Sequence, residues 1–285
     1  MLTQTEMLVI SMILSKINLN TGNHSMQHAL KLALILCICS PSLEALREKI
    51  VNGNPFRTGN ADAVIEDFRR QVGKREVITF IGYSGRGYQN PEKMLKQARI
   101  FLSMRSPQEA VVNIGVTPEG IGAIYPLAKK MGFETFGIVS TQASDYLDGV
   151  KNVDHPYLVR DETWGGYQNS SQIKLNPTSA AMVAVSDVMV AYGAGDIGLA
   201  ELRAGQSYGK TIKAYVYDEN HEKSINKALK AGKEAPKIFH LPAFAEFSKR
   251  LGFSQRKIRR VPRRDNQENR AKKSKSSSGT SLTKQ

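Results

Sequence analysis

The sequence has little cysteine and no apolar segment long enough for a membrane span, and each shortage excludes a class of protein. Its 285 residues include two cysteines, Cys37 and Cys39. Two cysteines exclude a disulfide framework, and this pair is too small and too closely spaced to form a zinc site alone. The uncharged segment between Lys31 and Glu44 has 12 residues, too few to cross a bilayer as a helix. The remaining composition, 41% hydrophobic and 23% charged, is that of a globular protein.

One familiar site motif is also missing. The chain has no Walker A phosphate loop, because its GKT tripeptide at 209–211 lacks the glycine that the GxxxxGK spacing requires at position 204, which is an alanine. The histidines show no spacing typical of metal ligands, so we expect no metal site. They are His24, His28, His155, His221 and His240.

Positive charge is in excess, but it is concentrated at one end of the chain. The net charge is +14, and residues 254–285 carry +9 of it, with 11 basic and 2 acidic side chains. We expect residues 254–285 to be a disordered basic tail, because they are serine-rich and poor in apolar residues. Such a tail contacts nucleic acid or an anionic membrane electrostatically, or serves only in solubility or targeting. It has no interleaved aromatic residues for stacking on bases.

Residues 1–55 form a separate segment, for which we expect an apolar, helical extension packed on the domain. Within it, residues 26–45 have the outline of a signal peptide, with one lysine, an apolar stretch and then small residues. We expect a cytoplasmic protein, and the signal-like segment leaves secretion or membrane association open as alternatives.

Residues 56–253 show a regular alternation of short apolar runs and amphipathic segments. This pattern predicts a Rossmann-like α/β domain, in which helices cover both faces of a parallel sheet. The expected strands are 77–81, 110–114, 135–139, 157–159, 187–191 and 211–216. The expected helices are one capped by Asn60, then 91–104, 119–131 with Pro126 as a kink, 177–186 capped by Asn176, 197–207, 221–231 and 242–251.

Three of the expected strand-to-helix loops are rich in glycine. Because carboxyl ends of parallel strands lie at one edge of a sheet, we expect these loops to lie together there. Glycine allows the backbone to approach a bound group, and the helix that follows presents free N–H groups that suit phosphate. The candidate phosphate- or nucleotide-binding residues are Gly82, Ser84, Gly85, Arg86, Gly115, Thr117, Gly120, Gly193, Gly195, Asp196 and Gly198.

Four passages of residues 77–216 carry a resemblance to a known superfamily. They are VITFIGYSGRG, VNIGVTPEGIGAIYPLAKKMGFETFGIVS, AAMVAVSDVMVAYGAGDIGLAEL and AGQSYGKTIKAY. In order and spacing they resemble the SLOG superfamily, the Rossmann-like group that includes SMF/DprA and the LOG "lysine decarboxylase-like" phosphoribohydrolases. The resemblance covers about half of the chain.

This resemblance implies a nucleotide site and raises the question of catalysis. The LOG proteins hydrolyse nucleoside 5′-monophosphates to free the base, with an Arg and a Glu at the site. Glu201 stands at the position of that Glu, within an altered form of the family's PGGxGTxxE motif. Thr178 stands where the family has the Arg, which puts hydrolysis in doubt. At a helix N-terminus, Thr178 is still placed to hold a phosphate.

We therefore predict binding of a nucleotide or an ADP-ribose-like molecule at the glycine loops, and we assign no other cofactor. One alternative is a LOG-type phosphoribohydrolase with Glu201 as its catalytic residue, and another is a DprA-like nucleic-acid-binding protein that uses the basic tail. A homo-oligomer is a further alternative that the sequence leaves open. Trp164, in a long loop, either stacks a base or packs as a lid, and we favour packing. We expect Asp145, Asp148, Asp154 and Asp161 to be solvated.

Overall fold

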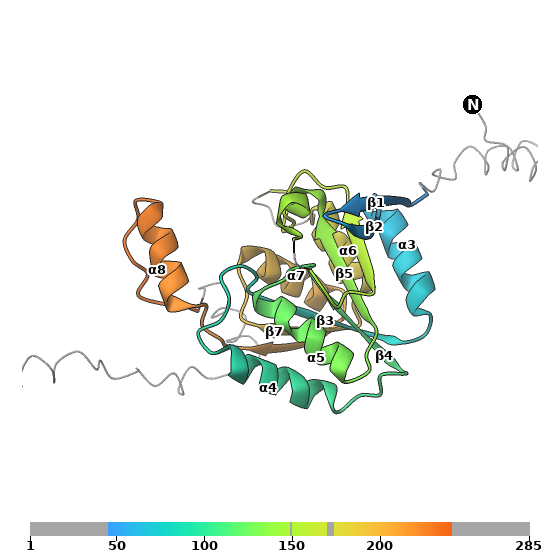
Figure 1. Cartoon of the computed structure of the whole chain (residues 1–285), viewed down its shortest axis with the longest axis horizontal. Coiled ribbons are helices and arrows are strands. Elements are labelled where there is room, and N and C mark those ends of the chain that lie inside the picture. Colours follow the sequence, from blue (N-terminus) through green and yellow to red (C-terminus); the bar gives the residue numbers. More distant parts are fainter. Residues whose placement is uncertain (1–44, 149, 170–173, 241–285) are drawn as a thin grey trace, which may run out of the picture.

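A single sheet organises the described part of the chain. The computed structural model describes residues 45–240, without residues 149 and 170–173. Eight strands of this part form the order β1-β2-β6-β5-β4-β3-β7-β8, and all neighbours are parallel except β1 and β2 (Figure 1). The strands are β1 (Arg47–Val51), β2 (Asn54–Gly59), β3 (Glu76–Gly82), β4 (Ala110–Ile114), β5 (Thr135–Ser140), β6 (His155–Val159), β7 (Val188–Tyr192) and β8 (Thr211–Tyr215). The predicted Rossmann-like α/β fold is confirmed.

Helices cover both faces of this sheet, which explains why its central strands are mostly apolar. α4 and α5 pack on the face that presents Phe80 and Ile114, whereas α3, α6 and α7 cover the opposite face. The helices are α3 (Ala61–Val72), α4 (Pro91–Leu102), α5 (Ile124–Lys130), α6 (Pro177–Val185), α7 (Asp196–Ser207) and α8 (His221–Lys230), with 3₁₀ segments at Gly120–Ala123 and Thr141–Tyr146. α8 stands out from the body of the domain (Figure 1).

Three predicted helix starts can be compared with the structure. Asn60 caps α3, since its Oδ1 accepts a hydrogen bond from the Ala63 N–H at 2.9 Å. Pro126 does not kink a helix. The helix α5 begins at Ile124, so Pro126 lies in its first turn, where a backbone N–H would have no partner within the helix and its absence removes no hydrogen bond. Asn176 precedes α6, but its side chain makes no cap and instead donates to the carbonyl oxygens of Gly165 and Tyr167.

The N-terminal part of the described chain differs from expectation. We predicted a helical extension over residues 1–55, but β1 and β2 form an antiparallel hairpin at the sheet edge. Asn52 and Gly53 make its turn, both with positive φ. Residues 1–44, the helix expected at 242–251 and the basic tail lie outside the described residues. No helix of the described part is long and apolar enough to cross a membrane.

The order of the strands creates one crevice of interest. β3 and β7 are neighbours, but β3 leads into α4 on one face and β7 leads into α7 on the other. The loops that follow these two strands therefore diverge from the carboxyl edge of the sheet. In open α/β sheets, ligands bind at such a topological switch point.

Candidate functional site

The three glycine loops meet at the carboxyl edge of the sheet, as predicted. The first loop lies between the other two: the Ile121 N–H donates to the Tyr83 carbonyl at 2.7 Å, and Gly193 lies against the Tyr83 ring. A Cβ added at Gly193 would lie 2.5 Å from that ring, and one at Gly120 would collide with the carbonyl oxygens of Tyr83 and Ser84. Both glycines also have positive φ, +61° at Gly120 and +67° at Gly193. Glycine at these two positions is thus needed to bring the loops together.

Gly85 differs from these packing glycines. A Cβ added there would have no atom of the described protein within 4 Å, and its φ lies outside the left-handed region. The backbone of the first loop is therefore open to solvent at Gly85. A side chain at this position would extend into open space without disturbing the fold.

Two of the predicted polar ligands are already engaged within the protein. Arg86 donates to Glu219 Oε2 at 2.7 Å, and the Glu219 side chain is only 4% exposed. The Thr117 hydroxyl donates to the Glu119 carbonyl within its own loop, at 3.2 Å. Ser84 and Asp196 remain exposed, and Asp196 is the first residue of α7. Arg86 and Thr117 are therefore held by contacts within the protein, whereas Ser84 and Asp196 face solvent.

The positions that correspond to the LOG site lie under a loop. Thr178 and Ser179 are buried in the first turn of α6, and Glu201 is buried on α7. The Ser179 hydroxyl donates to Glu201 Oε1 at 2.7 Å and accepts from the Gly166 N–H at 2.7 Å. Burial raises the pKa of Glu201 to about 7, although the Ser179 hydrogen bond works in the opposite direction.

Asp161 is a site residue that the sequence analysis missed. It was expected to be solvated, but it is buried and accepts hydrogen bonds of 2.8 Å from the Thr163 N–H, the Thr163 hydroxyl and the Thr178 N–H. Burial alone would raise its pKa, but these donors stabilise the carboxylate and the net shift is downward. An Asp that bonds to the backbone two residues ahead is an Asx turn, so the Asp161-x-Thr163 spacing was the available signal.

Asp154 is likewise not simply solvated. Its carboxylate pairs with Lys129 at 2.7 Å and accepts from the Thr135 N–H at 2.9 Å. It lies with Lys129 at the amino end of β5, away from the glycine loops. Its role is structural.

Exposed aromatic side chains flank the same edge. Trp164 is 53% exposed, and Tyr146 is 67% exposed. Their ring centroids are 5.7 Å apart in an edge-to-face arrangement, although the residues come from the loops after β6 and β5. Ile197, in the first turn of α7, is also exposed, and a Cβ added at Gly165 would lie 3.4 Å from it. An apolar patch therefore lies beside the α7 N-terminus.

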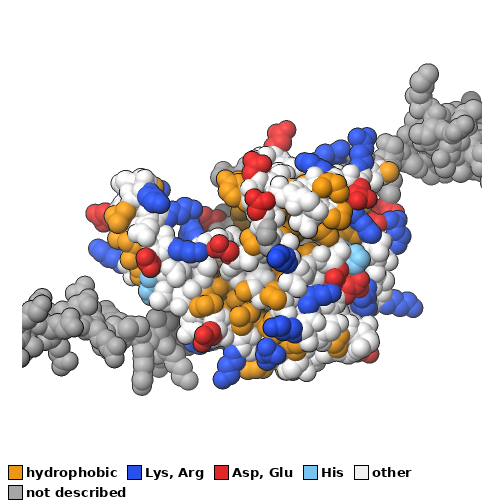
Figure 2. Space-filling model, in the orientation of Figure 1, with side chains coloured by type: hydrophobic (Ala, Val, Ile, Leu, Met, Phe, Trp, Pro, Cys, Tyr) orange, Lys and Arg blue, Asp and Glu red, His pale blue; other side chains and the backbone are white. Residues whose placement is uncertain are grey.

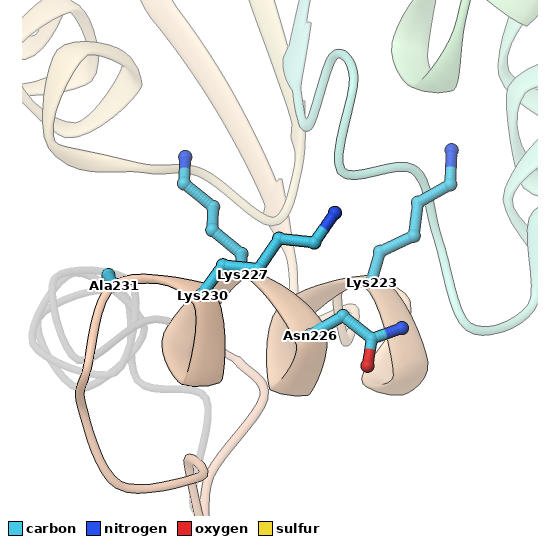
Figure 3. A pocket seen from close by; sticks show the side chains of 5 residues that line it. All are labelled: Lys223, Asn226, Lys227, Lys230 and Ala231. Atoms are coloured by element: carbon cyan, nitrogen blue, oxygen red, sulfur yellow. The ribbon is translucent and has the colours of Figure 1, made fainter.

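A basic surface lies along one side of α8, next to the first glycine loop. A shallow, open depression of about 560 Å³ there is lined by Lys223, Asn226, Lys227, Lys230 and Ala231, which belong to α8 and the residue after it. Figure 3 shows the three lysine side chains extending from one side of α8 toward the body of the protein. In the space-filling view, blue side chains line this side of α8 (Figure 2). The sequence analysis did not single out these lysines.

α8 is attached directly to the first glycine loop and the residues after it. The Asn220 N–H donates to the Gly87 carbonyl at 3.2 Å, and the His221 N–H donates to Gln89 Oε1 at 2.9 Å. Lys223 Nζ donates to the Gly85 carbonyl at 3.3 Å and pairs with Glu119 at 2.9 Å. Across the described ranges, no three His, Cys, Asp or Glu side chains are grouped as metal ligands would be.

No known protein family matches the chain, and no curated protein matches it. Solved structures give distant matches. The molybdenum cofactor carrier protein of Chlamydomonas reinhardtii is 17% identical, over 62% of this chain and 99% of that one, with a TM-score of 0.36. The molybdenum cofactor binding protein of Rippkaea orientalis is 17% identical, over 63% and 98%, with a TM-score of 0.37. A third structure, TM1055, is 17% identical over 48% and 72%, with a TM-score of 0.34.

Likenesses of this size concern the fold alone and say nothing about activity. The strand order and the helices on both faces define a Rossmann-like α/β domain. That architecture fits the SLOG resemblance of residues 77–216. The function has to be inferred from the site itself.

Proposed function

We propose that the protein binds a nucleotide or a nucleotide-derived molecule, such as ADP-ribose, at the carboxyl edge of the sheet. The observation that carries this proposal is the position of the loops at residues 82–87 and 193–195, which follow the neighbouring strands β3 and β7 at the switch point. The first turn of α7 begins there, and its N–H groups and positive dipole end attract a phosphate, whereas the exposed Asp196 carboxylate of the same turn repels one.

The exposed aromatic patch supports a ligand with a flat ring. Trp164 and Tyr146 lie on loops after neighbouring parallel strands, at the same edge as the glycine loops. Aromatic side chains stack on any base, because every base has a π-face. A ligand with phosphate at the α7 N-terminus and its base on this patch would use both features.

The environment of Glu201 favours binding over hydrolysis. A LOG-type reaction needs a carboxylate that faces the ribose and a charged group that holds the substrate. Glu201 is 7% exposed and hydrogen-bonded to Ser179, and Thr178 supplies no charge. The DprA-like alternative depends on residues 254–285, which lie outside the described part, and it stays open.

The test is a titration of the full chain with AMP, GMP and ADP-ribose, followed by calorimetry and by tryptophan fluorescence. Trp164 is the one tryptophan of the sequence, so a change in emission reports on its loop. The molybdenum cofactor belongs among the compounds tested. We expect at least one nucleotide to bind and to alter the emission.

A glycine variant separates the proposed site from any other. Gly85→Val should reduce affinity at least tenfold and leave the melting temperature within about 2 °C, because its side chain enters open space. Ser103→Val, at an exposed position after α4, is the control. The proposal fails if no nucleotide binds, or if Gly85→Val binds as tightly as the wild type. Rapid release of free base, lost in Glu201→Gln, would establish the hydrolase instead.

A further inference from the structure

One side of α8 carries cations in a regular row. Lys223, Lys227 and Lys230 are spaced four and three residues apart, so their side chains share one face of the helix. Figure 3 shows all three extending to the same side. Neighbouring charges of a single sign on a surface add up to a local electrostatic potential, and a positive potential attracts anions.

The charge in this row is largely uncompensated. Lys223 pairs with Glu119, but Lys227 and Lys230 make no ion pair with any described residue. Like charges three or four residues apart on a helix repel each other by a few tenths of a kcal/mol. An arrangement that costs stability in the free protein is explained if an anion binds along this side of α8.

The macrodipole of α8 offers a simpler reason for basic residues in its last turn. The macrodipole accounts for cations near the C-terminus of the helix, but it favours cations on every face of that turn equally. It does not account for a row that turns toward the body of the protein and begins, at Lys223, in contact with Gly85 and Glu119. The row of lysines therefore begins at the glycine loops and extends away from them along α8.

We propose that the α8 lysines bind the phosphate chain of the ligand beyond its first phosphate, so that the ligand class is a nucleoside diphosphate, a triphosphate or a diphosphate-bridged nucleotide. This inference rests on the proposed function, because the first phosphate lies at the glycine loops. Lys223 joins the two parts: its ammonium lies 3.3 Å from the Gly85 carbonyl, and one turn of helix separates it from Lys227. Lysine suits this role as a compact charge with three donors.

The experiment compares AMP with ADP on the full chain by calorimetry at 0.15 M salt. The variant is Lys227→Gln with Lys230→Gln, which keeps the fold because both side chains are exposed and unpaired among the described residues. The matched control is Lys74→Gln with Lys130→Gln, two exposed lysines at the amino edge of the sheet. Both double variants lower the net charge by the same amount.

We expect the wild type to bind ADP at least tenfold more tightly than AMP. The α8 variant should lose at least tenfold in ADP affinity and less than threefold in AMP affinity, and the control should change neither. Equal binding of AMP and ADP by the wild type, or equal losses for both ligands in the α8 variant, would overturn the inference and leave the proposed function standing. If neither AMP nor ADP binds, the proposed function itself fails. Binding of a single-stranded oligonucleotide without ADP binding would overturn both.

Discussion

The Ser179 hydroxyl donates a hydrogen bond of 2.7 Å to Glu201 Oε1, and the same oxygen accepts one of 2.7 Å from the Gly166 N–H. The carboxylate on α7 is thereby connected, through one side chain of α6, to the loop that carries Trp164. Asp161 fixes the start of that loop through Thr163 and Thr178. The residues at the LOG-like positions thus hold the loop, and the loop presents an aromatic ring at the carboxyl edge.

The buried carboxyl of Glu201 should make stability depend on pH. Its pKa is about 7 in the folded protein, above the ordinary value of 4.5. The stability that the protonated group contributes is therefore complete below pH 4.5 and is lost as the pH rises through 7. Relative to Glu201→Gln, the wild-type free energy of unfolding should fall by about 3 kcal/mol between pH 4.5 and 7.5. Urea denaturation of both proteins at several pH values measures this, and parallel pH profiles would contradict it.

The ion pair between Arg86 and Glu219 should show coupling. Arg86→Gln leaves the Glu219 carboxylate buried without its charge partner, which should cost about 2 kcal/mol, reduced from the fully buried case because Arg86 is 39% exposed. The double variant with Glu219→Gln should cost at least about 1 kcal/mol less than the sum of the single variants. The exposed pair of Lys223 and Glu119 provides the comparison, with a coupling below about 0.5 kcal/mol. Additive effects at Arg86 and Glu219 would show that the pair is unimportant for folding.

The central strands could be predicted because burial on both faces leaves most of their residues apolar. Ala110–Ile114 was predicted with the bounds that the structure has. The β1–β2 hairpin was missed because its strands, REKIV and NPFRTG, are rich in polar residues; β1 is the edge strand and β2 lies between β1 and β6. Its signal was the Asn52-Gly53 turn, since that dipeptide readily adopts two positive φ angles.

The candidate site was predictable only in part. The loops that follow parallel strands all lie at one edge of the sheet, so the alternation of strands and helices in the sequence was enough to predict that the glycine loops converge. The ion-pair partners of the charged residues could not be predicted in this way. Arg86 pairs with Glu219 across 133 positions, and Lys223 pairs with Glu119 across 104. Such pairs depend on where α8 lies in space, which no local pattern in one sequence specifies.

Glycine substitutions should separate packing from ligand access. Gly193→Ala should destabilise the protein by about 2–4 kcal/mol, because its Cβ would lie 2.5 Å from the Tyr83 ring and its φ is +67°. Gly85→Ala meets no neighbour and should leave stability unchanged or raise it by up to about 1 kcal/mol. Thermal unfolding of the two variants measures the difference. Equal melting temperatures would show that the loops are not packed as described.

The aromatic patch should determine how tightly the base is held, provided that the proposed nucleotide binds. Stacking on an aromatic side chain is worth about 1–3 kcal/mol per base, so Trp164→Leu should weaken binding at least fivefold, and Tyr146→Leu by less, since it meets Trp164 edge to face. Tyr208→Leu is the matched control, because Tyr208 is 65% exposed at the other end of α7. Calorimetry is the measurement, as Trp164→Leu removes the fluorescent residue. The affinity for inorganic phosphate should not change in any of the three variants. If Trp164→Leu and Tyr208→Leu bind the nucleotide equally well, the base lies elsewhere, and Trp164 serves only to pack its loop.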